Sequence, residues 1–156
     1  MKVLKKYIAL IAQPLCHIIT HSFLEGVFPD TLKIAVIKPI HKKGSLQEFG
    51  SYRPISLLTS FSKIFEKLLF TRLTSFFKKF GIFNVNQHDF LKNKGIETAV
   101  FSLLNAIYQT MDQGDVPLGL FLDLTKAFDT VDHRVLLTKC EMYGIRNNQL
   151  KLIESY

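Results

Sequence analysis

The longest regular repeat of apolar and polar positions predicts an amphipathic helix over Thr59 to Phe80. Apolar side chains recur there every three or four residues and form one broad stripe, which is typical of a helix packed on a core. Thr59 or Ser60 is placed to cap the start of this helix, and Gly81 to end it. The stripe consists of Phe61, Ile64, Phe65, Leu68, Leu69, Leu73, Phe76, Phe77 and Phe80.

The same spacing predicts further helices on both sides of this one. Pro14 interrupts the first of them and is expected to kink or split it, because proline removes a backbone donor and clashes with the preceding turn. Asp132 is a candidate cap for a later helix, and Gly144 is its expected stop. The predicted helices run from Val3 to Leu24, from about Glu97 to Met111, from His133 to Tyr143, and from Asn147 or Asn148 onward.

Short apolar runs predict extended segments at 32–40, 52–58 and 116–123. In the third run Leu118, Leu120 and Leu122 alternate with other residues, and the run ends at Asp123. This pattern predicts a buried strand with an acid at its end. Carboxylates are seldom buried unless they are paired or bound to metal. Helices together with these strands predict an α+β fold.

The composition of the chain shows an excess of basic over acidic residues. The chain has 156 residues, of which 47% are hydrophobic, so it can bury a core, and its length favours one domain. Twenty basic against thirteen acidic residues give a net charge of +7. That excess favours a polyanionic partner such as nucleic acid without proving one. Cys16 and Cys140 lie far apart, so we expect free thiols and no disulfide partner.

The N-terminal segment faintly resembles a secretory signal, because lysines precede an apolar run. Gln13, Pro14 and His17 interrupt that run. A membrane span is excluded by length, since about 20 apolar residues are needed. We therefore expect no membrane partner and an intracellular protein, either nuclear or cytoplasmic.

Three site chemistries fit an acid at the end of an apolar strand. Phosphatases of the haloacid dehalogenase type and nucleotide-sugar transferases both use a D-x-D pair, whose second position here is Thr125. A two-metal polymerase needs one acid here and more from a later hairpin. Phe128 would then lie beneath the incoming sugar and exclude a 2′-hydroxyl. Alternatively, Phe128 is a core residue and Asp123 only caps the next turn.

Basic residues surround the first two extended segments. Lys38, Lys42 and Lys43 flank the first, and Pro54 biases Arg53 towards an extended conformation in the second. They fit either a solvated edge strand or a basic finger near phosphates. The spacing alone does not separate these interpretations.

Four segments in order resemble successive blocks of the reverse transcriptases of non-LTR retrotransposons, which are LINE-type elements, and jockey-like ones especially. The resemblance runs from about Gly26 to Tyr156. The second and fourth blocks are long and specific. The blocks read GVFPDTLKIAVIKPIHKKG, YRPISLLTSFSKIFEKLLFTRL, NQHDFLKNKG and FLDLTKAFDTVDH.

The resemblance implies a right-hand polymerase fold, truncated before the rest of the palm and the thumb. Residues 1–110 would be the N-terminal extension and fingers, and residues 111–156 the start of the palm. It implies an RNA-directed DNA polymerase that uses an RNA template, a DNA primer and deoxynucleotides. Two Mg²⁺ ions would activate the primer 3′-hydroxyl and stabilise the leaving pyrophosphate.

The resemblance also assigns roles to particular residues. Asp123 would be the first catalytic metal ligand, the backbone carbonyl of Leu124 would face a metal, and Phe128 would be the sugar gate. Arg53 would lie near the triphosphate or template. The nucleic-acid-binding lysines would be Lys38, Lys42 and Lys43.

The sequence departs from the family pattern in two places. The fingers motif Q-x-G-F-R is changed: Asp89 replaces a glycine, Leu91 replaces the arginine and Asn93 replaces a second glycine. We expect the change at Asp89 to remove a backbone conformation that glycine adopts easily. The palm hairpin with paired aspartates is absent, so one carboxylate would have to hold two divalent ions.

This second departure predicts a fragment that is inactive by itself, with an unpaired strand edge at 116–123. Two rival interpretations remain open. The chain is either a non-catalytic, basic nucleic-acid-binding or interaction module derived from the element, or a chain that never folds stably.

Overall fold

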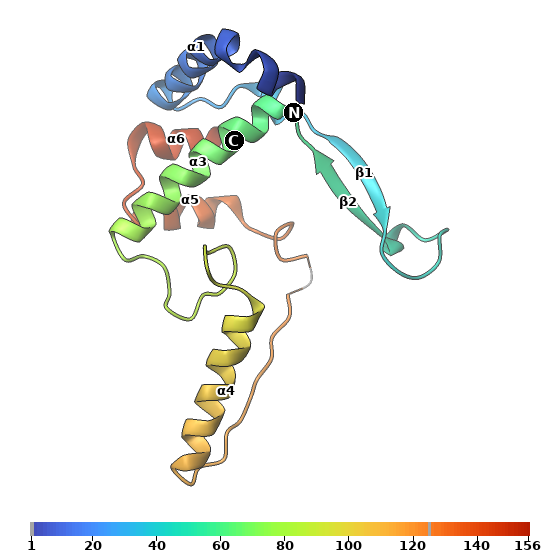
Figure 1. Ribbon diagram of the computed structural model, residues 1–156, viewed down its shortest axis with the longest axis vertical. Coiled ribbons are helices and arrows are strands. Elements are labelled where there is room, and N and C mark those ends of the chain that lie inside the picture. Colours follow the sequence, from blue (N-terminus) through green and yellow to red (C-terminus); the bar gives the residue numbers. More distant parts are fainter. Residues whose placement is uncertain (1, 125) are drawn as a thin grey trace. The chain divides into compact units, whose positions relative to one another are not determined.

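The computed structural model describes residues 2–124 and 126–156 (Figure 1). Thr125, which argued against a D-x-D site, lies outside these residues. The chain divides into two compact units. The first comprises Met1–Thr74 and Val131–Tyr156, and the second comprises Ser75–Thr130.

All the predicted helices are confirmed in their order, with ends shifted by one or two residues, and α2 is a short addition. α1 runs unbroken through Pro14, so a split at this residue was wrong. Pro14 cannot donate a hydrogen bond to the carbonyl of Leu10. This loss is tolerated because Leu10 is 76% exposed, so water can reach this side of the helix. The helices are α1 (Lys2–Glu25), α2 (Asp30–Lys33), α3 (Ser60–Lys79), α4 (Ile96–Asp112), α5 (His133–Met142) and α6 (Asn147–Ser155).

A small aromatic core holds the first unit together. Phe28, Phe65 and Leu152 are fully buried, and Ile19 joins them. The Phe65 ring stacks on Phe23 at 5.5 Å and meets Phe28 edge-to-face at 4.5 Å. α6 packs against both α1 and α5. The core therefore joins the N-terminal helix, the predicted stripe of α3 and the C-terminal helix.

Local signals at both ends of α3 act as the sequence predicts. Thr59 Oγ1 accepts a hydrogen bond from the backbone N–H of Ser62 at 3.1 Å. The buried Ser62 hydroxyl donates to the carbonyl of Leu32 at 2.9 Å, which ties the helix start to α2. Gly81 takes a φ of +62°, and the N–H of Ile82 donates to Phe77 O at 2.9 Å. The left-handed glycine thus ends α3.

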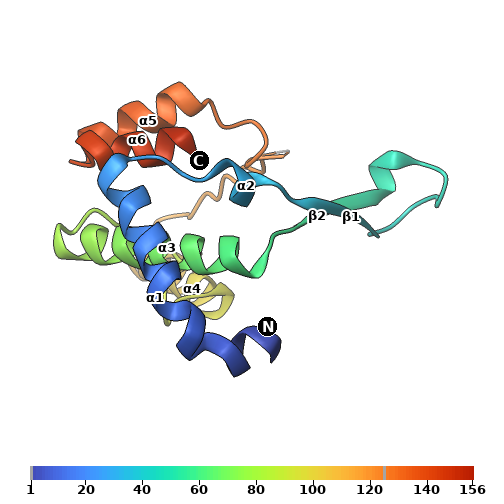
Figure 2. The same ribbon diagram turned by 90° about the horizontal axis from the view of Figure 1, so that it is seen from above.

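The sheet of the first unit is a single antiparallel hairpin of β1 (Val36–His41) and β2 (Tyr52–Leu57). β1 starts later than predicted, because residues 30–33 form α2. The register pairs Lys38 with Ile55 and Ile40 with Arg53. In both views the hairpin projects away from the helices of its unit (Figures 1 and 2). Almost all of its side chains are consequently exposed.

α1 corrects the membrane argument made from length. Lys6–Glu25 is a 20-residue helix that is long and apolar enough to cross a membrane, judged by length and composition. The exclusion by length was therefore wrong, because the scattered polar residues of this segment leave its mean hydropathy high, at 1.3. Core helices of soluble proteins and signal sequences meet the same criterion of length and hydropathy. Leu15, Ile19 and Phe23 of this helix pack into the core of the first unit.

Tyr156 provides a pH-dependent contact in the same unit. Its ring meets Phe28 edge-to-face at 4.7 Å, and its hydroxyl donates to the Glu66 carboxylate. Burial, and then the bond to Glu66 and the charge of Glu66, raise the pKa of Tyr156 to about 12. Because this pKa is raised above its unfolded value of 10, the stability from the neutral phenol is present below pH 10 and is lost as pH rises through about 12.

We predict that the difference in phenolate absorbance between the wild type and Tyr156→Phe titrates with a midpoint near pH 12. In Glu66→Gln the midpoint should fall, because the nearby negative charge is removed. A Tyr156 midpoint at its ordinary value in the wild type would contradict the contact.

Candidate functional site

The segment before Asp123 is extended but forms no strand. Residues 115–124 are irregular, and their apolar side chains lie in water, with Leu118 97% and Leu122 83% exposed. The predicted buried strand was therefore wrong. A strand needs a neighbour for its backbone hydrogen bonds, and within the described residues the sheet contains only β1 and β2. The chain enters this segment after Gly114, whose φ of +81° reverses its direction beyond α4.

Asp123 and Leu124 lie at the end of this exposed segment. The Asp123 side chain is exposed, and Leu124 is 76% exposed. Across residues 2–124 and 126–156, Asp123 makes no hydrogen bond or ion pair. The acid is therefore accessible to an ion or a ligand, and no side chain in the described part of the chain orients it.

Phe128 is presented by a tight turn. The N–H groups of Asp129 and Thr130 donate to Lys126 O at 2.9 and 3.1 Å, and Lys126 has a φ of +55°. The Phe128 ring is 79% exposed and meets Phe90 edge-to-face at 6.0 Å. Phe128 is thus not a core residue. No sequence pattern indicated the contact with Phe90, because it joins residues 38 positions apart.

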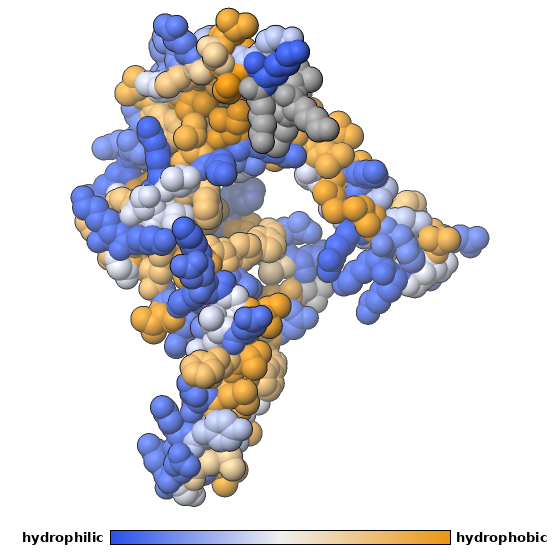
Figure 3. Space-filling view, in the orientation of Figure 1, coloured by the Kyte–Doolittle hydropathy of each residue, from blue (hydrophilic) through white to orange (hydrophobic). Residues whose placement is uncertain are grey.

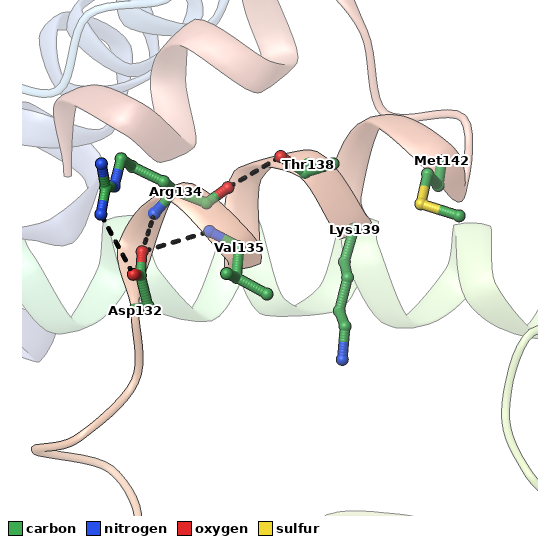
Figure 4. A pocket seen from close by; sticks show the side chains of 6 residues that line it. All are labelled: Asp132, Arg134, Val135, Thr138, Lys139 and Met142. Atoms are coloured by element: carbon green, nitrogen blue, oxygen red, sulfur yellow. Dashed lines mark hydrogen bonds and ion pairs between the residues drawn. The ribbon is translucent and has the colours of Figure 1, made fainter.

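Asp132 acts as a helix cap. Its carboxylate accepts bonds from the backbone N–H groups of Arg134 at 2.8 Å and Val135 at 3.3 Å (Figure 4). The bonds from Val135 and then Arg134 hold the pKa of Asp132 below its ordinary value. The groove of 460 Å³ beside it is lined only by this residue and the α5 side chains Arg134, Val135, Thr138, Lys139 and Met142. The predicted cap is confirmed.

A two-metal site does not fit the donor set of the described residues. Nowhere in residues 2–124 and 126–156 do three histidine, cysteine, aspartate or glutamate side chains gather. The Asp132 carboxylate already caps α5 and pairs with the Arg134 guanidinium at 3.5 Å. Mg²⁺ requires octahedral oxygen ligands, and two ions close together require several carboxylates. Asp123 can supply one of them.

The loop that carries the altered fingers motif is held to the start of α4. Lys94 Nζ donates to Val85 O at 2.6 Å, and His88 Nδ1 lies 2.8 Å from the Thr98 hydroxyl. That hydroxyl also accepts from the Gly95 N–H at 3.0 Å. Two residues of the loop adopt left-handed backbone, Phe90 with a φ of +62° and Asn93 with a φ of +65°.

Asp89 does not take a positive φ, as expected if aspartate removes a conformation that glycine adopts easily at this position. The left-handed conformation is found at Phe90 and at Asn93, and Asn93 is the other position where the family pattern has glycine. Asparagine tolerates this conformation better than most residues, because its short side chain can bond locally. The glycine-like turn is thus kept at Asn93 without glycine. Leu91 is half-buried.

We predict that Asn93→Ala lowers the free energy of unfolding of the second unit by about 1–2 kcal/mol, the usual cost of left-handed backbone for a residue with a Cβ. Asn93→Gly should lower it by less than half as much, because glycine adopts this φ freely. Asp89→Ala is the matched control in the same loop and should be nearly neutral. Urea denaturation of the three variants tests this, and equal effects of alanine at 89 and 93 would contradict it.

The predicted basic residues gather on the hairpin of the first unit. Lys38, Lys42, Lys43 and Arg53 are all exposed. Because Lys38 pairs with Ile55 and Ile40 with Arg53, Lys38 and Arg53 project from the same face of the hairpin. Asp123 and Phe128 belong to the second unit. The predicted site residues are therefore divided between the two units, with the basic ones in the first and Asp123 and Phe128 in the second.

Residues 40–156 match the family described as reverse transcriptase (RNA-dependent DNA polymerase). Among curated relatives from Drosophila melanogaster, the chain is 34% identical to the probable RNA-directed DNA polymerase from transposon BS, over 80% of this chain and 14% of the relative. It is 37% identical to the probable RNA-directed DNA polymerase from transposon X-element, over 68% of this chain and 12% of the relative. It is 35% identical to the RNA-directed DNA polymerase from mobile element jockey, over 80% of this chain and 14% of the relative.

The chain thus spans 12–14% of the length of these relatives. No solved structure gives a significant match. The match covers the hairpin strand β2, the altered fingers motif, Asp123 and Phe128. The resemblance to the reverse transcriptases of non-LTR transposons is confirmed, and the chain belongs to the reverse transcriptase family.

Proposed function

We propose that this chain supplies the fingers and the first part of the palm of an RNA-directed DNA polymerase from a non-LTR retrotransposon. The family match over residues 40–156 carries the proposal. Residues 1–110 would belong to the N-terminal extension and fingers, and residues 111–156 to the start of the palm. Its partners would be an RNA template, a DNA primer and deoxynucleotides, inside the nucleus or cytoplasm.

In this proposal Asp123 supplies one carboxylate of a magnesium site, and the Leu124 carbonyl faces the same ion. Support comes from the exposure of both residues beside an accessible turn. Magnesium would polarise the primer hydroxyl and neutralise the charge on the leaving group. The donor set described above is too small to hold two ions, so the chain by itself is inactive.

Phe128 would exclude the 2′-hydroxyl of a ribonucleotide. Its support is the turn at 126–130, which holds the ring in the open rather than in a core. Arg53 and the three lysines would attract the triphosphate or the template, supported by their exposure on one hairpin.

Primer extension on an RNA template tests the inactivity of the chain itself. With Mg²⁺ or Mn²⁺, residues 1–156 should incorporate no deoxynucleotide above the level of an Asp123→Ala control. Incorporation that the control lacks would overturn the inactivity and support Asp123 as a ligand.

A chimaera tests the positive part of the proposal. Residues 26–156 replace the matching segment of the polymerase from mobile element jockey, and extension is measured with deoxynucleotides and ribonucleotides. Asp123→Ala should lower the rate by about a hundredfold or more, because a lost metal ligand removes several kcal/mol of charge stabilisation. Phe128→Ala should raise ribonucleotide use relative to deoxynucleotide use. An active chimaera that is indifferent to Asp123→Ala would refute the assignment.

A further inference from the structure

The tip of the β1–β2 hairpin exposes an aromatic ring that the proposed roles leave unused. Phe49 is 97% exposed, and Leu46, in the same turn, is 69% exposed. A phenylalanine side chain gains free energy from burial and is usually covered. An isolated exposed ring needs no explanation, so the surroundings of Phe49 decide whether it has a use.

The backbone that carries Phe49 is ordered by its own hydrogen bonds. The Lys42 N–H donates to Ser51 O at 2.8 Å and extends the ladder beyond β1. The Tyr52 hydroxyl donates to Leu46 O at 2.8 Å, and its ring meets His41 edge-to-face at 5.4 Å. Phe49 itself begins a 3₁₀ turn that ends at the buried Ser51.

Gly44 closes the tip. It has a φ of +92°, and an added Cβ would lie 2.7 Å from Ser51 Oγ. The positive φ favours glycine at this position, and an added Cβ would also force the Ser51 hydroxyl to shift. The tip is therefore a hydrogen-bonded turn of defined conformation, and this turn presents the Phe49 ring to solvent.

The charge around this ring has one predominant sign. Between residues 36 and 57 the hairpin carries Lys38, Lys42, Lys43 and Arg53 against Glu48 alone. Within residues 2–124 and 126–156, none of these four cations forms an ion pair. Figure 3 shows hydrophilic side chains over the outer part of the hairpin, with a small hydrophobic patch among them. Unpaired cations beside an exposed ring fit a ligand with both phosphates and aromatic faces.

We infer that the hairpin tip binds single-stranded nucleic acid, with an unpaired base stacked on Phe49 and neighbouring phosphates contacted by Lys42 and Lys43. A base offers its face to a protein ring only when it is unstacked, which favours a single strand over a duplex. The inference rests on the proposed polymerase function and adds Phe49 to its nucleic-acid contacts.

Tryptophan fluorescence gives a direct test, because the chain contains no tryptophan. Phe49→Trp places one reporter at the tip, and the variant is titrated with oligouridylate or oligothymidylate of about 20 nucleotides at low salt. Stacking should quench its fluorescence. Phe70→Trp is the matched control, since Phe70 is also exposed, at 57%, but lies on α3. Its fluorescence should stay unchanged.

Affinity separates stacking from charge. Phe49→Ala should weaken single-strand binding about 5- to 150-fold, the range of one base–aromatic stack, and leave the salt dependence unchanged. The double substitution Lys42→Ala, Lys43→Ala should flatten the slope of log K against log[salt] by about 1.4, or about 0.7 for each phosphate that is no longer neutralised. Because the Phe49 ring touches almost nothing, its replacement should leave the far-ultraviolet circular dichroism unchanged.

Three results would each overturn the inference: equal affinity of the wild type and Phe49→Ala, equal quenching at positions 49 and 70, or a duplex of the same length bound as tightly as the single strand. Absence of binding at low salt would overturn it as well. The polymerase proposal is judged by the response of the chimaera to Asp123→Ala, so the two fail by different measurements.

Discussion

Replacing Phe65 by alanine is expected to lower the free energy of unfolding of the first unit by about 3–5 kcal/mol, the usual cost of emptying a buried phenylalanine site. Phe65 is fully buried and contacts Phe23 and Phe28, so its replacement opens a cavity at the meeting point of the unit's helices. Small domains have only about 5–15 kcal/mol of stability in total. Because its core contains few buried residues, the first unit of the Phe65→Ala variant should lose most of its cooperative unfolding transition.

Urea denaturation followed by circular dichroism measures this effect. Phe70→Ala is the matched control on the same helix, because Phe70 is 57% exposed, and it should change the unfolding free energy by less than about 1 kcal/mol. Equal effects at 65 and 70 would show that the aromatic core does not hold the unit. A wild type without a cooperative transition would support the rival view that the chain does not fold stably.

Gly26→Ala should destabilise the same unit by about 2–5 kcal/mol, from left-handed strain and overpacking together. Gly26 has a φ of +72°, and an added Cβ would lie 2.6 Å from the backbone oxygen of Asn148. That oxygen belongs to α6, whose Asn148 side chain also donates to the carbonyl of Leu24. The end of α1 and the start of α6 therefore cannot move apart without breaking this hydrogen bond.

Two other glycines separate the cost of the left-handed backbone from the cost of overpacking. Gly81 has a φ of +62° with nothing near its missing Cβ, so Gly81→Ala should cost only the conformational part, about 1–2 kcal/mol. Gly50 has neither constraint, and Gly50→Ala should lie within about 0.5 kcal/mol of the wild type. Thermal and urea unfolding should rank the destabilisation as 26, then 81, then 50. If Gly26→Ala destabilised the protein no more than Gly81→Ala does, the close approach of α6 to Gly26 would be refuted.

The helices could be predicted because their signals act within a few residues. The stripe of α3, the Thr59 cap and the Gly81 stop each involve groups no more than five positions apart. The same holds for Asp132, which caps α5 through N–H groups two and three residues later. Family membership was also readable, since it depends on the order of long motifs and not on contacts between them.

The core could be predicted only in part. Phe65 lies on a periodic stripe, but Phe28 stands alone between Gly26 and Pro29, where no repeat marks it as buried. Its burial follows from α6, more than a hundred residues away, where Ser155 accepts its N–H at 2.7 Å. In the fingers loop, the sequence drew attention to Asp89, whereas the left-handed residues of the backbone are Phe90 and Asn93.

The sequence by itself determined the helices, the two extended segments that form β1 and β2, the family and the identity of the candidate residues, because these depend on local spacing and motif order. That β1 and β2 pair as a hairpin came from the structure. The tertiary structure alone decided that residues 116–123 form no strand and that Asp123 stands in water, because a strand exists only where another strand takes its hydrogen bonds. It also decided which phenylalanines are buried and which are exposed. Phe28 and Phe49 have the same side chain, and only their surroundings make one the centre of the core and the other an exposed ring at the hairpin tip.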